Sequence, residues 1–347
     1  MASDFNLRPA IAYGANTTDE ALRTAAQYGI EDAVVYYGPG AGQSPDFQDY
    51  VALRLRFESY GLKIIAIEGG FSPHRKWHDV VFGGPRRDEM IEQLQDQVRF
   101  MARAGIPIYG YNWMPNSWGR ANPVTIRGGA MGTAYQWDFD KERRPLMYGE
   151  PMSEDNMWDC IEYWIKAITP VAEEEGIRLG IHPEDPPVED RGGVPGLLRS
   201  FDAFKKLMSF SDSHYNAIEF CQGTFSEMPG EDIYEMIEYF AKRDKILYVH
   251  FRNVSGQAPS FNEEFINTGY VDMKKAMRTY RDAGYKGSFI DDHCPIMEDD
   301  ADFPGNLGGY RSRLFAQGYI QGVIDGVTRE GDYGGPVSTS ASNGGTA

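Results

Sequence analysis

The chain has 347 residues, of which 41% are hydrophobic and 24% are charged, so it can bury a large core. Its formal net charge of -17 excludes nucleic acid and anionic membranes as favourable partners, because surfaces of like charge repel each other. The sequence has no apolar run of the roughly 18 to 20 residues that cross a bilayer, and residues 1–10 lack a signal-peptide layout. Three cysteines are too few for a disulfide framework, so we expect a cytoplasmic protein.

Short β-branched or aromatic runs alternate with amphipathic helical patterns along the chain. We expect strands at residues 11–14, 32–37, 63–69, 106–113, 178–183, 216–223, 246–253 and 287–294. We expect a helix after each strand, at residues 20–28, 45–60, 87–104, 154–175, 201–210, 232–243, 272–283 and 310–327. Glycines stand where left-handed helix caps belong, at Gly29, Gly61, Gly105, Gly176 and Gly284.

Eight consecutive strand–helix pairs predict an α/β fold, in which a parallel sheet closes into a (β/α)₈ TIM barrel. We assign residues 1–328 to this one catalytic domain. An open, doubly wound sheet is the main rival, but it would usually show a glycine-rich phosphate turn after an early strand, and the sequence has none.

Two segments fall outside the repeating pattern. Residues 116–151, after the fourth strand, are rich in glycine, arginine and aromatic residues and are too long for a plain loop. This extended loop either caps the active site or serves as a structural or oligomer contact. Residues 329–347 are rich in glycine, serine and threonine, which predicts a disordered tail, because such a segment cannot bury apolar surface.

Side chains with metal-binding chemistry stand at the ends of the last four expected strands. They are His182, Cys221, His250 and Asp292, the last followed by His293. Because active sites of these barrels lie at the carboxyl ends of the strands, these side chains should converge on one part of the barrel mouth. A lone histidine or cysteine there is more often structural. Four at equivalent positions predict a shared divalent metal, and mixed nitrogen, sulfur and oxygen ligands leave Mn²⁺, Zn²⁺, Co²⁺ and Fe²⁺ open.

The pleat of the strands predicts which neighbours share the inward face. Alternate side chains of a barrel strand point inward. Glu219 should therefore lie on the same face as Cys221, and Tyr248 on the same face as His250.

Three further positions have open interpretations from the residues alone. Asp185 follows His182 closely and either contacts substrate or caps backbone donors. Arg252 follows His250 and either holds a substrate carboxylate through a bidentate pair or forms a surface ion pair. Tyr310 begins the last expected helix behind two glycines, and on this pattern alone packing is the more common role.

The sequence resembles the mannonate dehydratase family, within the xylose-isomerase-like barrels. The resemblance covers most of residues 105–327 and is weaker before them. Its matching segments are residues 111–115, 118–120, 170–187, 221–228, 250–253, 269–273, 291–293 and 308–323. The combination of HPEDPP with the later cysteine, HFR and DH elements is fairly specific.

The resemblance implies a metal-dependent lyase of hexuronate catabolism, which dehydrates D-mannonate to 2-keto-3-deoxy-D-gluconate and forms a homo-oligomer. It implies Mn²⁺ as the typical metal, held by His182, Cys221, His250 and Asp292. It makes His293 and Tyr310 the proton-transfer pair, which raises Tyr310 above a packing role. The side chains that we expect to contact substrate are Asn112, Trp118, Arg120, Asp185 and Arg252.

Two departures from the family pattern concern the substrate. The family's last strand usually reads Arg-Pro-Asp-His, whereas this chain has Ile290, Asp291, Asp292 and His293. A family histidine ahead of the Gly-x-x-Asp-Met element is absent from residues 266–268. The metal ligands are intact, so the substrate is D-mannonate, another sugar acid, or a neutral or keto sugar. The alternative functions are a metal-dependent sugar isomerase or epimerase, which expels no water, and a non-catalytic sugar-binding relative, which would carry no metal.

Overall fold

The computed structural model describes residues 6–38, 44–69, 77–115, 119–138, 151–298, 300 and 309–329. Within these residues, eight parallel strands close a barrel in the order β1-β12-β10-β9-β8-β4-β3-β2. Their bounds are Arg8–Gly14 for β1, Asp32–Tyr36 for β2, Lys63–Glu68 for β3, Ile108–Tyr111 for β4, Arg178–Ile181 for β8, Asn216–Cys221 for β9, Ile246–His250 for β10 and Ser288–Ile290 for β12. All eight expected strands are confirmed, and so is the barrel.

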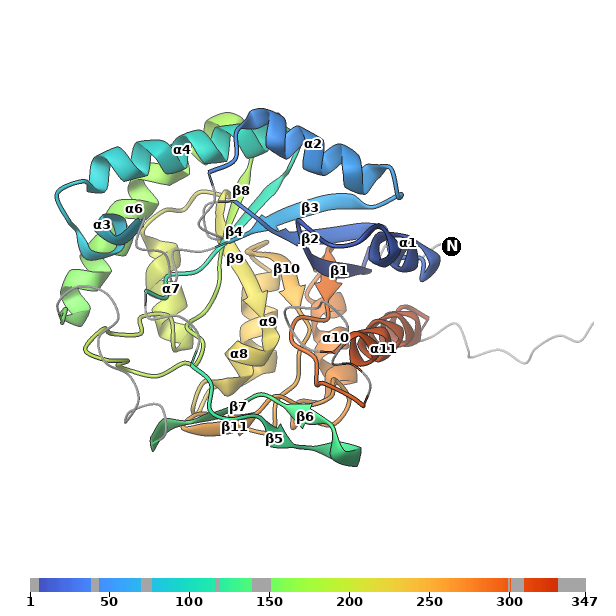
Figure 1. Cartoon of the computed structure of the whole chain (residues 1–347). Helices are drawn as coiled ribbons and strands as arrows, with labels where there is room; N and C mark the ends of the chain where they lie inside the picture. Colours follow the sequence, from blue (N-terminus) through green and yellow to red (C-terminus); the bar gives the residue numbers. More distant parts are fainter. Residues whose placement is uncertain are drawn as a thin grey trace, which may run out of the picture.

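Helices follow the barrel strands and surround them (Figure 1). The eight expected ones are α1 (Asp19–Gln27), α2 (Phe47–Glu58), α4 (Arg87–Arg103), α6 (Glu154–Glu175), α7 (Phe201–Ser209), α9 (Ile233–Ala241), α10 (Met273–Asp282) and α11 (Tyr310–Thr328). In the described ranges, short helices that were not expected include α3 (His78–Phe82), α8 (Gln222–Glu227) and a 3-10 helix at Arg127–Gly129. None of the helices in the described ranges is long and apolar enough to cross a membrane.

Local capping explains where the helices begin and end. Ser153 accepts a hydrogen bond from the backbone N–H of Asn156 at the start of α6, and Asp272 does the same for Lys275 at the start of α10. All five glycines that the sequence marks as caps have positive φ, between 72° and 84°. These chain reversals return the backbone from each helix to the next strand.

Apolar side chains fill two layers. A small cluster lies on the inward faces of the strands and includes Ala12, Val34, Ala217 and Ile290. A much larger cluster lies between the strands and the helices and includes Trp164 of α6. Burial of this second layer supplies most of the apolar stabilisation, at about 25 cal/mol per Å² of surface removed from water.

Two small antiparallel sheets lie across one end of the barrel. Strand β7 (Ala134–Gln136) pairs with β11 (Ser260–Asn262), and β5 (Val124–Thr125) pairs with β6 (Met131–Gly132). Figure 1 places them at the end toward which β9 and β10 point. The described part of the extended loop after β4 therefore lies at the carboxyl end of the barrel, where a cap of the site belongs.

Some expectations fall on residues outside the described ranges. Trp118 and residues 139–150 of the extended loop are among them. Residues 330–347 are also outside, so the tail stays a prediction. Tyr310 is the first residue of α11, but its side chain is not among those described.

Candidate metal centre

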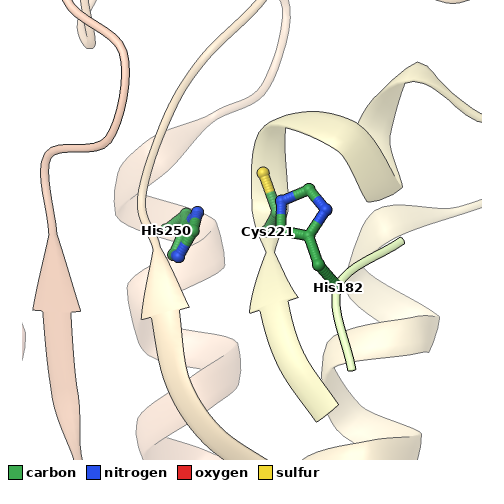
Figure 2. Close-up of side chains that lie close together, drawn as sticks. All are labelled: His182, Cys221 and His250. Atoms are coloured by element: carbon green, nitrogen blue, oxygen red, sulfur yellow. The ribbon is translucent and has the colours of Figure 1, made fainter. Parts of the chain in front are cut away.

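Three of the four expected ligands meet at the carboxyl end of the barrel. His182 follows β8, Cys221 ends β9 and His250 ends β10, and Figure 2 shows the three side chains together. One ligand atom from each lies within 4.8 Å of the other two. All three residues are buried, with exposed fractions of 3%, 0% and 1%. Neighbouring strands thus bring together imidazole and thiol groups that are 29 residues or more apart in the sequence.

Asp292 lies beside two of these residues, His250 and Cys221. Its Oδ1 is 3.5 Å from His250 Nδ1, and its Oδ2 is 3.7 Å from Cys221 Sγ. The residue comes just after β12 and has a φ of 52°, a conformation that costs roughly 1–2 kcal/mol for a residue other than glycine. Three of the four positions read from the strand ends thus form one group, and Asp292 contacts two members of that group.

The donor set fits a divalent cation. Burial disfavours the thiolate of Cys221, but Arg252 and His182 outweigh burial and lower the pKa of the thiol to about 5. His182 Nδ1 is 2.7 Å from the carbonyl oxygen of Pro183, so a proton on Nδ1 leaves the lone pair on Nε2. A buried thiolate, imidazoles and a carboxylate are together ligands for Mn²⁺, Zn²⁺, Co²⁺ or Fe²⁺.

Arg252 is a buried residue whose guanidinium pairs with several carboxylates. The exposed fraction of its side chain is 0%, so the surface ion pair considered from the sequence is wrong. Its Nε is 2.9 Å from Asp292 Oδ2, and its Nη2 is 3.5 Å from Cys221 Sγ. The other carboxylates around its guanidinium belong to Asp185, Glu227 and Glu263. Arg252 thus connects two expected metal ligands to a buried acidic network.

Glu263 joins this network from the capping sheets. It comes just after β11, and its backbone N–H donates to the carbonyl oxygen of Thr133 at 2.8 Å. Its carboxylate pairs with Arg120 as well as with Arg252. Burial opposes ionisation of Glu263, but His293 and these arginines hold its pKa well below the ordinary value. Glu263 was not expected at the site, because it follows no barrel strand.

The expected catalytic histidine lies between two of these acids. His293 Nδ1 is 2.8 Å from Glu263 Oε1, and His293 Nε2 is 3.7 Å from Asp292 Oδ1. Burial lowers the pKa of His293, but the two carboxylates outweigh burial and raise it above the ordinary value. The side chain is 17% exposed, so it can be reached from the barrel mouth.

The residues expected to contact substrate have different settings. Asn112 is buried just after β4, and its Oδ1 accepts a hydrogen bond from the backbone of Met114. Arg120 is 17% exposed, and its Nη1 is 2.7 Å from Asp185 Oδ1. Asp185 is fully buried, and its carboxylate pairs with Arg120 and Arg252.

A second acidic group lies next to His250. Glu68 at the end of β3, Glu219 on β9 and His250 each offer a ligand atom within 4.8 Å of the others. His250 Nε2 is 3.2 Å from Glu219 Oε1 and 3.3 Å from Glu68 Oε2. Burial and the neighbouring Glu68 raise the pKa of Glu219 to about 7. Glu219 was expected on this inward face, whereas Glu68 was overlooked although it too ends a strand.

The two residues of the last strand that differ from the family pattern, Ile290 and Asp291, are both buried. Ile290 lies in the apolar cluster inside the barrel. Asp291 is buried, and its Oδ2 is 3.0 Å from Arg313 Nη1 on α11. The additional acid beside Asp292 is therefore paired with a cation from the last helix.

A family model, a relative and a solved structure that resemble this chain are all described as mannonate dehydratases. The family model for D-mannonate dehydratase (UxuA) matches residues 8–144 and 136–332. The mannonate dehydratase of Streptococcus pneumoniae (strain 70585) is 30% identical over 355 aligned residues, which cover 93% of this chain and 94% of that protein. A crystal structure of mannonate dehydratase from Streptococcus suis serotype 2 matches with a TM-score of 0.85 and 27% identity, over 99% of both chains. A D-tagatose 3-epimerase-like protein, with a TM-score of 0.61 and 12% identity, shares the fold alone.

Proposed function

The chain belongs to the mannonate dehydratase family, and on this premise we propose that it is a metal-dependent hydro-lyase that removes water from D-mannonate or a closely related sugar acid. The observation that carries the proposal is the convergence of His182, Cys221 and His250 at the barrel mouth. The alternative of a sugar isomerase or epimerase is less well supported, because the epimerase-like structure shares only the fold with this chain.

We propose one divalent cation, Mn²⁺ before Zn²⁺, Co²⁺ or Fe²⁺, with His182, Cys221, His250 and Asp292 as its ligands. A bound cation would supply positive charge, which stabilises the negative charge that develops on the substrate carboxylate when the neighbouring carbon loses its proton. The lowered pKa of Cys221 supports this ligand set, because a metal binds the thiolate.

We assign the proton transfers to His293 and Tyr310. Glu263 accepts from Nδ1 of His293, which leaves Nε2 to take the proton from the carbon beside the substrate carboxylate. A tyrosine hydroxyl ordinarily has a pKa of about 10, so we assign to Tyr310 the proton for the departing hydroxyl group, which leaves as water. The remaining enol then takes up a proton on the carbon that lost the hydroxyl group and gives up its own O–H proton, which forms the 2-keto-3-deoxy acid and returns His293 and Tyr310 to their starting protonation states.

Substrate recognition is proposed for Asn112, Trp118, Arg120, Asp185 and Arg252. Of the two arginines, Arg120 has the better access to a ligand, because its side chain is 17% exposed and that of Arg252 is 0% exposed. A direct contact between Arg252 and a substrate carboxylate would require one of its buried ion pairs to separate. We therefore expect Arg120 to contribute more to binding of the substrate carboxylate.

A product assay tests this function. The purified protein with Mn²⁺ is incubated with D-mannonate, other sugar acids and keto sugars, and products are analysed for the 2-keto-3-deoxy group. Formation of that group from a sugar acid supports the dehydratase. Isomerised or epimerised sugar without loss of water would instead support the alternative.

We also propose a cellular compartment and an oligomeric state for the protein. The three cysteines are all free and buried, which supports a reducing compartment, the cytoplasm. We propose a homo-oligomer with a small-molecule substrate and no nucleic-acid or membrane partner, in keeping with the net charge of -17.

A further inference from the structure

The ring of His250 has different partners on its two sides. Nδ1 is 3.5 Å from Asp292 Oδ1, on the side of the proposed metal ligands. Nε2 is 3.2 Å from Glu219 Oε1 and 3.3 Å from Glu68 Oε2. A neutral imidazole carries one proton, and carboxylates accept that proton in a hydrogen bond. None of these contacts has hydrogen-bond geometry, but two carboxylates lie near Nε2 and one near Nδ1, so their negative charge favours the form with the proton on Nε2 and the lone pair on Nδ1.

The barrel is built to hold Glu219 in this place. Glu219 and Cys221 share the inward face of β9, and in the neighbouring strand Tyr248 pairs with Glu219 while His250 pairs with Cys221. Two other strands carry glycine where they approach the Glu219 side chain or backbone. A Cβ at Gly110 would overlap the carboxylate of Glu219 and the hydroxyl of Tyr248, and one at Gly180 would lie 3.1 Å from the Glu219 nitrogen.

Apolar packing alone does not explain a carboxylate at this position. Glu219 is 1% exposed, and the effective cost of burying a charge is several kcal/mol unless partners compensate. The cluster inside the barrel is otherwise formed by hydrophobic side chains such as Ala217, Leu247 and Ile290. Glu68 is held in turn by Tyr248, whose hydroxyl donates to Glu68 Oε2 at 3.3 Å.

We propose that Glu219, assisted by Glu68, is a positioning residue that fixes the ring and the proton of His250 so that Nδ1 binds the metal. Carboxylates that accept from the outer nitrogen of a ligand histidine orient the ring and make it a stronger ligand. The inference rests on the metal centre proposed above. A second cation between Glu68 and Glu219 is the competing use of these residues, but it would have to bind Nε2, and His250 would then lose both ring protons.

The test measures metal affinity rather than turnover. Metal-free wild type, Glu219→Gln and Glu68→Gln are titrated with Mn²⁺ and, separately, with Co²⁺, whose absorption reports coordination by thiolate. Asp32→Asn is the matched control, because Asp32 is also a buried residue with a carboxylate and is 6% exposed. Asp32 begins β2, and its carboxylate pairs with Arg8 of β1 instead of with a proposed metal ligand. Thermal unfolding of each metal-free variant shows that it is folded.

We expect one ion per wild-type chain and roughly 10- to 100-fold weaker binding by Glu219→Gln, the usual loss when the outer partner of a ligand histidine is removed. Glu68→Gln should show a smaller loss, and Asp32→Asn should bind as wild type does. If Glu219→Gln does not fold, Glu68→Gln carries the test.

Three results would overturn the inference. Unchanged Mn²⁺ affinity in both glutamine variants would remove the positioning role and leave the metal centre intact. Two ions in wild type and one in Glu219→Gln would assign the glutamates to a second cation. A wild-type protein that binds no divalent ion would remove the metal centre together with this inference.

Discussion

Cys221 is the proposed ligand whose chemistry depends most on its neighbours. A buried thiol ordinarily has a raised pKa, as Cys294 does in this protein, where burial is the main cause. Arg252 and His182 reverse this effect at Cys221 and bring its pKa to about 5. The protein therefore holds a thiolate at neutral pH at one cysteine and a protonated thiol at another.

Replacement of this thiolate should abolish tight metal binding. We expect Cys221→Ala to lower Mn²⁺ affinity by more than the ~10–100-fold that loss of an outer partner costs, because a direct ligand is removed. Cys160→Ala is the matched control, since Cys160 is buried on α6 away from the site. Metal content after dialysis, measured by elemental analysis, checks this. Equal metal content in the two variants would exclude Cys221 as a ligand.

Replacement of His293 should separate binding from catalysis. Because His293 is proposed to move a proton and not to hold the metal, His293→Ala should retain Mn²⁺ while kcat falls by about 10²–10⁴-fold. His214→Ala serves as the control, because His214 is an exposed histidine that lies 3.3 Å from Asp244. The measurements are metal content and turnover of the best substrate. Full activity in His293→Ala would remove this residue from the mechanism.

Only some residues of the site could be predicted from the sequence. His182, Cys221, His250 and Asp292 could be found because strand ends converge at one end of a barrel. Glu227 and Glu263 could not, because they lie outside the barrel strands and reach the site through the fold. The burial of Arg252 was also hidden, since sequence spacing does not show which carboxylates will surround a guanidinium.

At the scale of elements, long periodic segments were predictable and short ones were not. The eight barrel strands and their helices have local patterns that a single sequence shows. Strands β7 and β11 have three residues each, and they pair with each other across more than a hundred residues of chain. Helix α8 spans six residues and directly follows Cys221, where the pattern gave no separate signal.

Strand β4 offers a test of how closely the barrel interior is packed. Gly110→Ala would place a methyl group against the Tyr248 hydroxyl and the Glu219 carboxylate, so we expect a loss of about 1–3 kcal/mol in the free energy of unfolding. Gly14→Ala on β1 is the control, because a Cβ there meets no atom within 4 Å. Denaturant unfolding of both variants measures the difference. Equal stability would show that the interior beside Glu219 can adjust.

At the scale of the whole molecule, the acidic composition extends into the interior. The formal net charge is -17, and Asp185 and Glu263 are buried beside arginines. Burial raises the pKa of both carboxyls, but Arg120 and Arg252 outweigh it for Asp185, and His293 and the arginines outweigh it for Glu263, so both pKa values are lowered. The fold thus stabilises the ionised forms of these two acids.

This arrangement predicts a loss of stability in acid. The unfolded chain has ordinary pKa values of 3.8 for Asp and 4.5 for Glu, so on acidification it takes up protons before the folded protein does. The stabilisation is present above these values and is lost as the pH falls through the lower, folded pKa values. The contribution of Asp185 and Glu263 to the free energy of unfolding, measured from neutral pH downward, should therefore decrease in this range.

Glu263→Gln should show how much one buried carboxylate contributes to the free energy of unfolding. We expect it to lose about 3–5 kcal/mol at neutral pH, because buried cations lose their partner, and to show a shallower decrease in acid. Glu238→Gln, which removes an exposed partner of Lys242, should have a smaller effect. Parallel pH profiles for wild type and Glu263→Gln would contradict the account.

The most direct test of the central claim is an anomalous diffraction map from crystals of the wild-type protein grown with Mn²⁺. The account predicts one anomalous peak per chain, bounded by His182 Nε2, Cys221 Sγ, His250 Nδ1 and an Asp292 oxygen. A peak between Glu68 and Glu219, or no peak among the four ligands at saturating Mn²⁺, would contradict it.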